Sequence, residues 1–487
     1  MGENMEENYR NLCQVFTPNK NVKELLDWCD YKENLYGKKV MENSCGDGHI
    51  LQEVVKRYIE DCLEKEMPKV EIEKGLSNDI YAIEYDNPQY EKCKENLDNI
   101  VKENKLNKIN WKNIINEDAL LNISEDKFDY VVGNPPYIKY KSLSLEDRKY
   151  IREKFETCKK GKFDYCYAFI ESSIKSLKNN GRMAYLIPSS IFKNVFANDL
   201  REFIKPHIMK IYDYTITQLF DKSTNDQGTD RLVSSVIMVL EKNSNHDMIE
   251  YIDVNKNETT YIKKNKLEDK WVFKNKIEKS KNMKRFGDYF YVSNTIATLY
   301  NNAYVIKEYT EDRKYVYPKQ GGKIEKKVIK DTISPKTFKK EQIEKIIFPY
   351  YYNKSNELIK YDTNTFEKNF KGACEYLRNF KEKLENRNAD ENAKWFEYGR
   401  SQALRNSNNE KLLISTVITN EVKTKILPKN NIPYSGIYII PKKEKTLAEA
   451  EKILKSESFF EYIEGKGINA SGKSLRITSK DICEYMF

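Results

Sequence analysis

The chain has 487 residues, 39% of them hydrophobic, and its 84 Lys and Arg against 75 Asp and Glu give a net charge of +9. This length favours two or three domains, and the longest apolar runs, such as Val236 to Leu240, are far shorter than the roughly 18 residues of a membrane span. Because the N-terminus MGENMEENYR is polar and acidic, we expect a cytoplasmic protein without a secretory signal or membrane contact.

Nine cysteines and three histidines are scattered along the chain without a CxxC pair. This pattern predicts reduced thiols and disfavours both a zinc site and a disulfide framework. We therefore expect no bound metal.

The first half of the chain alternates strand-like and helix-like segments. Strands are expected at 38–44, 79–86, 110–118, 128–134, 182–190, 208–215 and 234–243, and helices near 50–65, 91–101 and 165–177. Repeated β–α alternation predicts a mostly parallel sheet covered by helices on both faces. Ligands of such sheets bind at the carboxyl ends of the strands.

The second half lacks this alternation and is strongly basic. Residues 1–245 hold 37 basic and 41 acidic side chains, a net charge of −4, whereas residues 246–487 hold 47 and 34, a net charge of +13. The contrast predicts a domain boundary near residue 245 and a second domain that faces a polyanion. The alternative is a composition that is simply rich in lysine.

Within the second half, short strand-like pieces predict a mixed α+β domain. Helices are expected near Phe366 to Asn386 and near Thr446 to Ser456. The lysine-rich stretch Lys319 to Lys340 is expected to be mobile or to face phosphate groups.

Polar residues follow the first three strands. Gly46 and Gly48 in ENSCGDGH let the backbone approach a ligand, and the helix that follows favours a carboxylate at its N-terminus. Glu84 ends the second strand, where an acidic residue can bind both hydroxyls of a ribose. Asp118 ends the third and can accept a hydrogen bond from an adenine amino group. The alternative for the two glycines is an ordinary strand-to-helix turn that binds no ligand. The alternative for Glu84 is an ordinary solvent-exposed strand end.

The fourth strand ends in FDYVVGNPPYIKY, where Asn134 precedes Pro135, Pro136 and Tyr137. Prolines fix φ, so the simplest interpretation is a rigid strand exit. The asparagine and the proline carbonyl also supply two hydrogen-bond acceptors on that rigid turn.

The ordered set QVFTP, ENSCGDG, AIEYD, NEDAL and GNPPY resembles the gamma class of DNA adenine-N6 methyltransferases, the Taq type. The similarity continues through residues 163–192 and 219–241, and KIIFPYYYN and WFEYGRSQAL resemble target-recognition domains more loosely. Two departures are the family's Glu-Pro-Ala-Cys, which is Glu-Asn-Ser-Cys here, and His49 in place of a small or apolar residue. Glu42 and both glycines are retained.

The resemblance implies a Rossmann-like, S-adenosylmethionine-dependent methyltransferase sheet in residues 1–245 and a mixed α+β target-recognition domain in residues 246–487. Glu84 would bind the ribose of S-adenosylmethionine and Asp118 its adenine, while Thr17 and the turn 42–48 would hold its methionine part. The expected cofactor-binding residues are Thr17, Pro18, Glu42, Ser44, Gly46, Glu84, Asp118 and Asn134.

The expected reaction methylates the amino group of an adenine that has left the duplex. The Asn134 side-chain oxygen and the Pro135 carbonyl would accept hydrogen bonds from the two N–H groups of this amino group. Pro136 would stiffen the turn. Tyr137 would stack on the base. By the resemblance, Phe220 would close the other face and Lys222 would lie near the DNA; a core aromatic residue and a solvated lysine are the alternatives.

The second domain would read the sequence of double-stranded DNA. Arg400 and Gln402 can pair with guanine and adenine edges, and the lysines of 319–340 can contact phosphates. Alternatively, the segment YGRSQ stabilises its own domain. We expect a monomer, acting alone or beside a separate cognate restriction endonuclease.

Three other functions share parts of this pattern. An RNA adenine methyltransferase and a protein glutamine methyltransferase must also hold a planar amino or amide nitrogen for methylation. A non-catalytic DNA-binding subunit could keep the same fold without the activity. The intact Asn134 turn disfavours the last of these.

Overall fold

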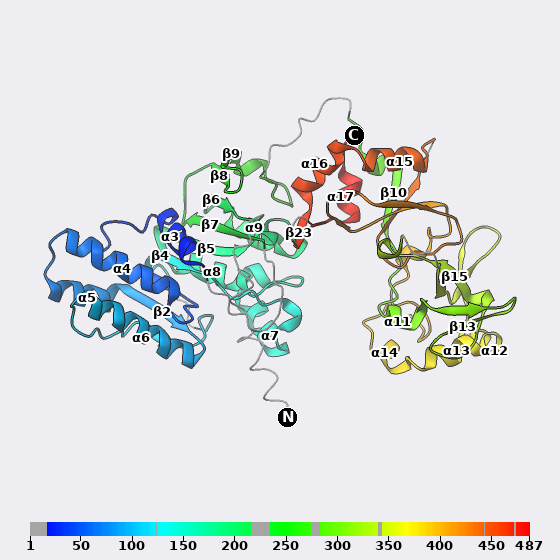
Figure 1. The fold of residues 1–487 in the computed structure, drawn as a ribbon, viewed down its shortest axis with the longest axis horizontal. Helices are drawn as coiled ribbons and strands as arrows, with labels where there is room; N and C mark the ends of the chain where they lie inside the picture. Colours follow the sequence, from blue (N-terminus) through cyan, green and yellow to red (C-terminus); the bar gives the residue numbers. More distant parts are fainter. Residues whose placement is uncertain are drawn as a thin grey trace. The chain divides into compact units, whose positions relative to one another are not determined.

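The computed structural model describes residues 17–121, 124–215, 234–273, 283–338, 343–442, 444–471 and 474–487. The chain divides into two compact units, Met1–Asn275 and Lys276–Phe487 (Figure 1). Within the described ranges, no helix is both long and apolar enough to cross a bilayer.

The N-terminal unit is built on a nine-stranded sheet in the order β3-β2-β1-β4-β5-β7-β6-β8-β9. Neighbours from β3 to β5 are parallel, and β7 is antiparallel to β5 and to β6. Strand order reverses at β1, which pairs with β2 on one side and β4 on the other. The strands are β1 (Val40–Glu42), β2 (Ile80–Glu84), β3 (Ile114–Asn116), β4 (Phe128–Gly133), β5 (Leu177–Pro188), β6 (Ile208–Asp213), β7 (Ser235–Glu241), β8 (Met248–Asp253) and β9 (Glu258–Lys263).

Helices cover both faces of this sheet, as expected. Its central strands read as continuous apolar runs because consecutive side chains enter different cores: Val131 packs into one core and Val132 into the other. One face carries α3 (Asn19–Trp28), α4 (His49–Glu64), α5 (Lys69–Asp79) and α6 (Asn87–Glu103). The other carries α7 (Leu145–Lys154), α8 (Cys166–Ser176) and α9 (Asn198–Ile204).

The boundary between the units lies after Asn275, not near residue 245. β8 pairs in parallel with β6, and β9 pairs with β8, so both strands extend the N-terminal sheet. The side chains of β8 alternate between half-buried and buried, whereas those of β9 are exposed or half-buried, which is the pattern of strands near a sheet edge. The change in composition near residue 245 therefore precedes the structural boundary.

The C-terminal unit has several small sheets and two hydrophobic cores. The largest sheet has the order β10-β22-β19-β21, formed by β10 (Phe290–Asn294), β22 (Ile437–Pro441), β19 (Lys411–Ile414) and β21 (Thr424–Leu427). The smaller sheets contain β11 (Val305–Ile306), β12 (Tyr309–Glu311), β13 (Tyr315–Pro318), β14 (Ile324–Glu325), β15 (Ile329–Thr332), β16 (Glu344–Ile347), β17 (Tyr350–Tyr352), β18 (Leu358–Lys360), β20 (Val417–Ile418), β23 (Ile468–Ser471) and β24 (Ser474–Arg476).

One expectation for this unit needs correction. The single helix expected near 366–386 is three short helices, α12 (Thr363–Asn369), α13 (Lys371–Arg378) and α14 (Lys381–Glu385), because Phe370 and Phe380 adopt non-helical backbone angles. In the lysine-rich stretch, the described residues 319–338 include β14, β15 and short 3-10 turns. The remaining helices are α10 (Phe286–Tyr289), α11 (Asn301–Tyr304), α15 (Leu447–Leu454), α16 (Glu457–Lys466) and α17 (Ser479–Glu484).

Candidate active site

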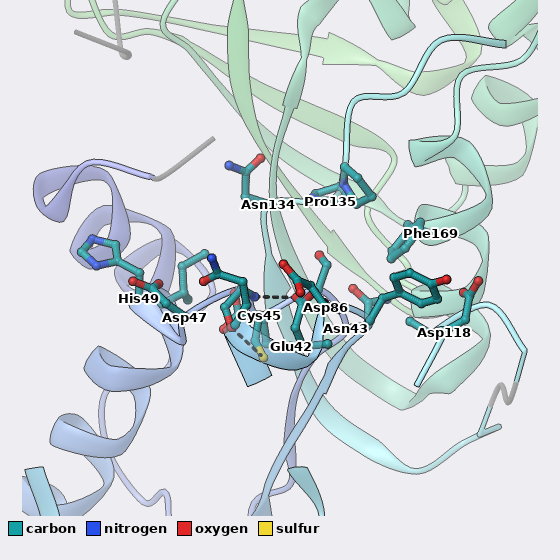
Figure 2. Close-up of a pocket in the computed structure, with 18 of the residues that line it drawn as sticks. Glu42, Asn43, Cys45, Asp47, His49, Asp86, Asp118, Asn134, Pro135 and Phe169 are labelled. Carbon is teal, nitrogen blue, oxygen red and sulfur yellow. Dashed lines mark hydrogen bonds between the residues drawn. The ribbon is translucent and has the colours of Figure 1, made fainter. Parts of the chain in front are cut away.

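A pocket lies at the carboxyl ends of β1, β2 and β4, beside the point where strand order reverses. Figure 2 shows the turn that bears Cys45 and Asp47 on one side of it, Phe169 and Asp118 on the other, and Asn134 above. Ten of the residues expected from the sequence line this one pocket: Thr17, Glu42, Ser44, Gly46, Glu84, Asp118, Asn134, Pro135, Pro136 and Tyr137.

The other five expected residues are not among the described residues that line it. Pro18 is the N-cap of α3 and stands next to the pocket residue Thr17. Phe220 and Lys222 fall outside the described residues. Arg400 and Gln402 belong to the C-terminal unit.

The glycine turn after β1 has the backbone that its sequence predicts. Gly46 has φ +53° and Gly48 has φ +81°, both in the left-handed region that favours glycine. A Cβ at Gly48 would lie 2.6 Å from the Cys93 sulfur. The Gly48 N–H donates to the Cys45 carbonyl at 2.8 Å, and α4 begins at the next residue. The turn is therefore short, and its geometry requires glycine.

Glu84 is held by two main-chain amides. Its Oε2 accepts a hydrogen bond from the Gly46 N–H at 2.7 Å, and its Oε1 accepts one from the Asp86 N–H at 2.8 Å. Burial raises the pKa of Glu84, and these two hydrogen bonds act in the opposite direction. Since each carboxylate oxygen can accept more than one hydrogen bond, the fixed carboxylate can still bind a ligand hydroxyl pair.

Three buried oxygens of the first turn accept no hydrogen bond within the described part of the chain. They are Glu42 Oε2, Ser44 Oγ and Asp47 Oδ1. Burial, and then the nearby Cys93 and Glu84, raise the pKa of Glu42 well above its usual value. Buried polar atoms are costly without a partner, so this group of acceptors fits a ligand that carries a cationic donor such as an ammonium.

Asn134 links the turn after β4 to the start of the described chain. Its Nδ2 donates to the Thr17 hydroxyl at 3.2 Å, across 117 positions of sequence. Asn134 and Thr17 both line the pocket, and Thr17 is buried. This contact fixes one end of the Asn134 amide.

Tyr137 is anchored at its hydroxyl. The phenol O–H donates to the Leu186 carbonyl of β5 at 2.7 Å, while the side chain lines the pocket. Burial raises the pKa of Tyr137 well above its usual value, so the phenol remains neutral. The orientation of the ring is thus set by the neighbouring strand.

Asp118 caps the turn after β3. Its Oδ1 accepts a hydrogen bond from the Leu120 N–H at 2.9 Å. The side chain is half-buried at the pocket wall, beside Ala119. Asp118 therefore has a fixed position from which it can meet a ligand amino group.

Sequence reasoning missed several pocket residues. Tyr165 and Phe169 both line the pocket, with ring centroids 5.2 Å apart; their spacing of four residues at the start of α8 was the available signal. Asp86 also lines it, two residues after Glu84. A pair of helical aromatics is equally typical of a core, so spacing alone could not distinguish them.

Asn43 explains one departure from the family pattern. Its Oδ1 accepts from the Tyr185 hydroxyl at 2.5 Å, and its Nδ2 donates to the Ser173 Oγ at 3.0 Å. Tyr185 and Ser173 are themselves 2.6 Å apart, and all three side chains are buried. The Tyr185 ring also lies 3.3 Å from the position of a Cβ on Gly133, the residue before Asn134. The asparagine thus joins the end of β1 to β5 and α8 at the wall of the pocket, which it also lines.

In the C-terminal unit, Arg400 already has a partner. Its Nη1 lies 2.8 Å from Asp390 Oδ1, and this hydrogen bond lowers the pKa of Asp390. The Arg400 N–H also donates to the Ala297 carbonyl. These contacts are those expected if YGRSQ stabilises its own domain, whereas Gln402 is exposed.

Residues 31–220 match the model of the Eco57I restriction-modification methylase family. The chain is 30% identical over 211 residues to the Type II methyltransferase M.BstVI of Geobacillus stearothermophilus, which covers 41% of this chain and 37% of that protein. It is 28% identical over 223 residues to the modification methylase CviBIII of Paramecium bursaria Chlorella virus NC1A, covering 46% and 48%.

A longer match joins the chain to the Type II restriction enzyme and methyltransferase RM.Eco57I of Escherichia coli. It is 23% identical over 343 residues and covers 62% of this chain and 33% of that protein. The chain thus spans less than half the length of each of these three relatives.

The solved structure of the Type IIL restriction-modification enzyme MmeI in complex with DNA has a similar fold. Its TM-score is 0.61 at 13% sequence identity, covering 95% of this chain and 64% of that one. The expected α/β fold class is confirmed: a Rossmann-like, mostly parallel sheet covered by helices on both faces, followed by a mixed α+β unit.

Proposed function

We propose that this chain is a DNA adenine-N6 methyltransferase that transfers a methyl group from S-adenosylmethionine to an adenine in duplex DNA. One observation carries the proposal. The acidic side chains at the ends of β1 and β2 share a single pocket with the Asn134-Pro135-Pro136-Tyr137 turn. The part of the pocket that would bind the nucleoside of the cofactor therefore lies next to the part that would accept hydrogen bonds from the amino group of the target base.

The described residues fit S-adenosylmethionine. The buried oxygens of Glu42, Ser44 and Asp47 would accept hydrogen bonds from its ammonium group, which supplies the donors that these atoms otherwise lack. Glu84 would bind its ribose hydroxyls, and Asp118 its adenine amino group. When bound, this cofactor supplies an electrophilic methyl group.

The chain's own contribution to the reaction is to activate the amino nitrogen of the target. An adenine amino group is a poor nucleophile, since its lone pair is delocalised into the ring. The Asn134 side-chain oxygen and the Pro135 carbonyl would each accept a hydrogen bond from one N–H group of the adenine amino group. This arrangement favours a tetrahedral nitrogen with a localised lone pair. Preorganised acceptors also stabilise positive charge that develops at nitrogen in the transition state.

The turn is suited to this task because it is rigid. Pro135 and Pro136 fix φ and have no N–H that would need a partner. Tyr137, whose ring is oriented by its bond to the Leu186 carbonyl, would stack on the extruded base. By the resemblance, Phe220 would cover the opposite face of the base, and Lys222 would lie near the DNA.

The comparisons support DNA as the substrate. The relatives are named as Type II methyltransferases and modification methylases, and MmeI has been solved with DNA. We propose that the C-terminal unit recognises the target site, with Gln402 near the bases and Arg400 placed by Asp390. We also propose that the protein acts as a monomer in the cytoplasm, either alone or beside a separate cognate restriction endonuclease.

The test is transfer of radiolabel from S-adenosylmethionine to matched samples of duplex DNA, RNA and total protein, followed by nucleoside analysis. We expect label in DNA as N6-methyladenine. Label that appears only in RNA or only in protein would overturn the proposal in favour of the corresponding alternative. Sequencing of modified adenines in DNA from expressing cells would then give the target site.

A further inference from the structure

The segment 139–164 leaves the sheet at the pocket and returns to it. Its end residues, Lys139 and Asp164, form an ion pair at 2.6 Å. The Tyr165 N–H donates to the Ile138 carbonyl at 2.9 Å, and both of these residues line the pocket. The segment therefore begins and ends at the rim of the proposed active site.

An arginine fixes the far part of this segment. Arg152 Nη1 donates to the Lys159 carbonyl at 2.9 Å, and its Nη2 donates to the Gly161 carbonyl at 3.0 Å and to the Tyr140 hydroxyl at 3.2 Å. The guanidinium also lies over the Tyr140 and Phe163 rings. These contacts of the Arg152 guanidinium fix the conformation of the loop formed by residues 159–162. The guanidinium itself is occupied by main-chain carbonyls and the Tyr140 hydroxyl.

A second arginine fixes the loop that follows β5. Arg201 is 1% exposed, and its Nη1 donates to the carbonyls of Ile191 and Asn194 at 2.8 and 2.7 Å. This loop ends in Val195 and Phe196, which are 65% and 44% exposed. Since β4 and β5 run in parallel, both loops leave the same edge of the sheet as the pocket.

The two loops meet at a glycine. Gly161 has φ +69°, and a Cβ there would lie 2.5 Å from Cδ1 of Phe196. The contact gathers three exposed lysines, Lys159, Lys160 and Lys162, beside the exposed Val195 and Phe196. We call these five residues the lysine surface.

The lysine surface is cationic in a part of the chain that is otherwise mildly acidic. The segment 139–164 holds nine basic and five acidic side chains, against 37 and 41 for residues 1–245. Exposed apolar side chains beside clustered lysines, on loops fixed by Arg152 and Arg201, match the sugar and phosphate groups of a nucleic acid.

We infer that the lysine surface binds the sugar-phosphate backbone of duplex DNA beside the adenine that enters the pocket. The inference rests on the proposed function. Lysines in this position would contribute affinity and hold the register of the duplex without reading its sequence. Each phosphate contact would also make binding more sensitive to salt.

The test compares the parent with Lys159→Ala/Lys160→Ala/Lys162→Ala in binding to a fluorescent duplex over a series of KCl concentrations. Three lost phosphate contacts would lower the slope of log Kd against log salt by about 2.7 and would raise Kd by about tenfold or more at low salt. The matched control is Lys32→Ala/Lys56→Ala/Lys108→Ala, three exposed lysines on other parts of the unit. The control should keep the parental slope.

S-Adenosylmethionine affinity, measured by calorimetry, should be unchanged in both triple variants because none of the six lysines lines the pocket. Suppose that the parent methylates DNA and that Lys159→Ala/Lys160→Ala/Lys162→Ala keeps the parental Kd for DNA and the parental salt slope. The inference is then wrong, while the proposed function stands. An equal loss in the control variant would also overturn it. If the parent fails to methylate DNA at all, the proposed function itself fails.

Discussion

The Gly46 N–H donates to Glu84 Oε2 at 2.7 Å, which joins the turn after β1 to the end of β2. The other carboxylate oxygen of Glu84 accepts the Asp86 N–H at 2.8 Å. The residue proposed to bind a ribose is therefore also a structural link between two loops of the pocket. Its replacement should change cofactor binding through both roles.

Glu84→Gln should weaken S-adenosylmethionine binding by about 10- to 100-fold. The amide places an NH₂ where one of two main-chain N–H donors needs an acceptor, and an unsatisfied buried donor costs about 1–3 kcal/mol. Isothermal calorimetry measures the change, with Glu60→Gln, exposed on α4, as the matched control. Parental affinity in Glu84→Gln would contradict the assigned role.

Asn134→Ala should lower kcat for methyl transfer by at least about 100-fold, the usual effect of removing one preorganised transition-state contact. Cofactor affinity should change little, because Glu42, Glu84 and Asp118 remain in place. Single-turnover transfer and calorimetry separate these two effects. Normal transfer by this variant would exclude the proposed activation of the amino group.

The sheet and the site were largely predictable from the sequence because both depend on short local patterns. The largely apolar run Phe128 to Val132 identified β4, and the glycines at 46 and 48 identified the turn, whose positive φ angles require them. Glu84 and Asn134 follow strands that proved to be near neighbours, so parallel topology brought them together.

Other features depend on contacts that local patterns do not encode. In β8, buried side chains alternate with half-buried ones, a pattern that would fit a strand of either unit. Its pairing with β6 is what assigns it to the N-terminal unit. The ion pair of Arg400 with Asp390 joins residues ten positions apart across a turn. In the sequence, Asn43 is only a departure from the family pattern, because its hydrogen-bond partners Ser173 and Tyr185 lie more than a hundred positions away.

Glu42→Gln should change how stability depends on pH in the cofactor-free protein. The folded pKa of Glu42 is raised well above 4.5 by burial, so the folded state binds more protons than the unfolded state as pH rises above 4.5. The parental free energy of unfolding should thus fall with rising pH through this window. Urea unfolding at a series of pH values from 4.5 upward should show that Glu42→Gln lacks this part of the fall. Parallel curves for the two proteins over the whole series would contradict the assignment.

The same ionisation should govern cofactor affinity. An ammonium group pairs with the charged form of Glu42, so parental affinity should rise with pH over the window in which the carboxyl ionises. Glu42→Gln should bind more weakly, with less dependence on pH. Calorimetry at several pH values measures both; an affinity for the parent that falls with pH would contradict a carboxylate–ammonium contact.

Asn43→Ala should destabilise the N-terminal unit by about 1–3 kcal/mol, because it removes the acceptor of a buried Tyr185 hydroxyl. Tyr185→Phe in the same chain removes that hydroxyl, so the double variant should lose less than the sum of the single losses. Urea unfolding of the four proteins gives the coupling free energy. Strict additivity would show that the contact contributes nothing.

Lys411→Met should remove a pH dependence of stability that originates in the C-terminal unit. Lys411 is fully buried, its Nζ donates to the Asn431 carbonyl at 2.7 Å, and burial lowers its pKa from 10.5 to about 7. Between these values the unfolded chain binds more protons, so the parental free energy of unfolding should rise with pH by at most about 1.4 kcal/mol per unit. Urea unfolding at pH 7 and pH 9 should show this rise in the parent and in Lys429→Met, an exposed control. An equal rise in Lys411→Met would assign the titration to another group.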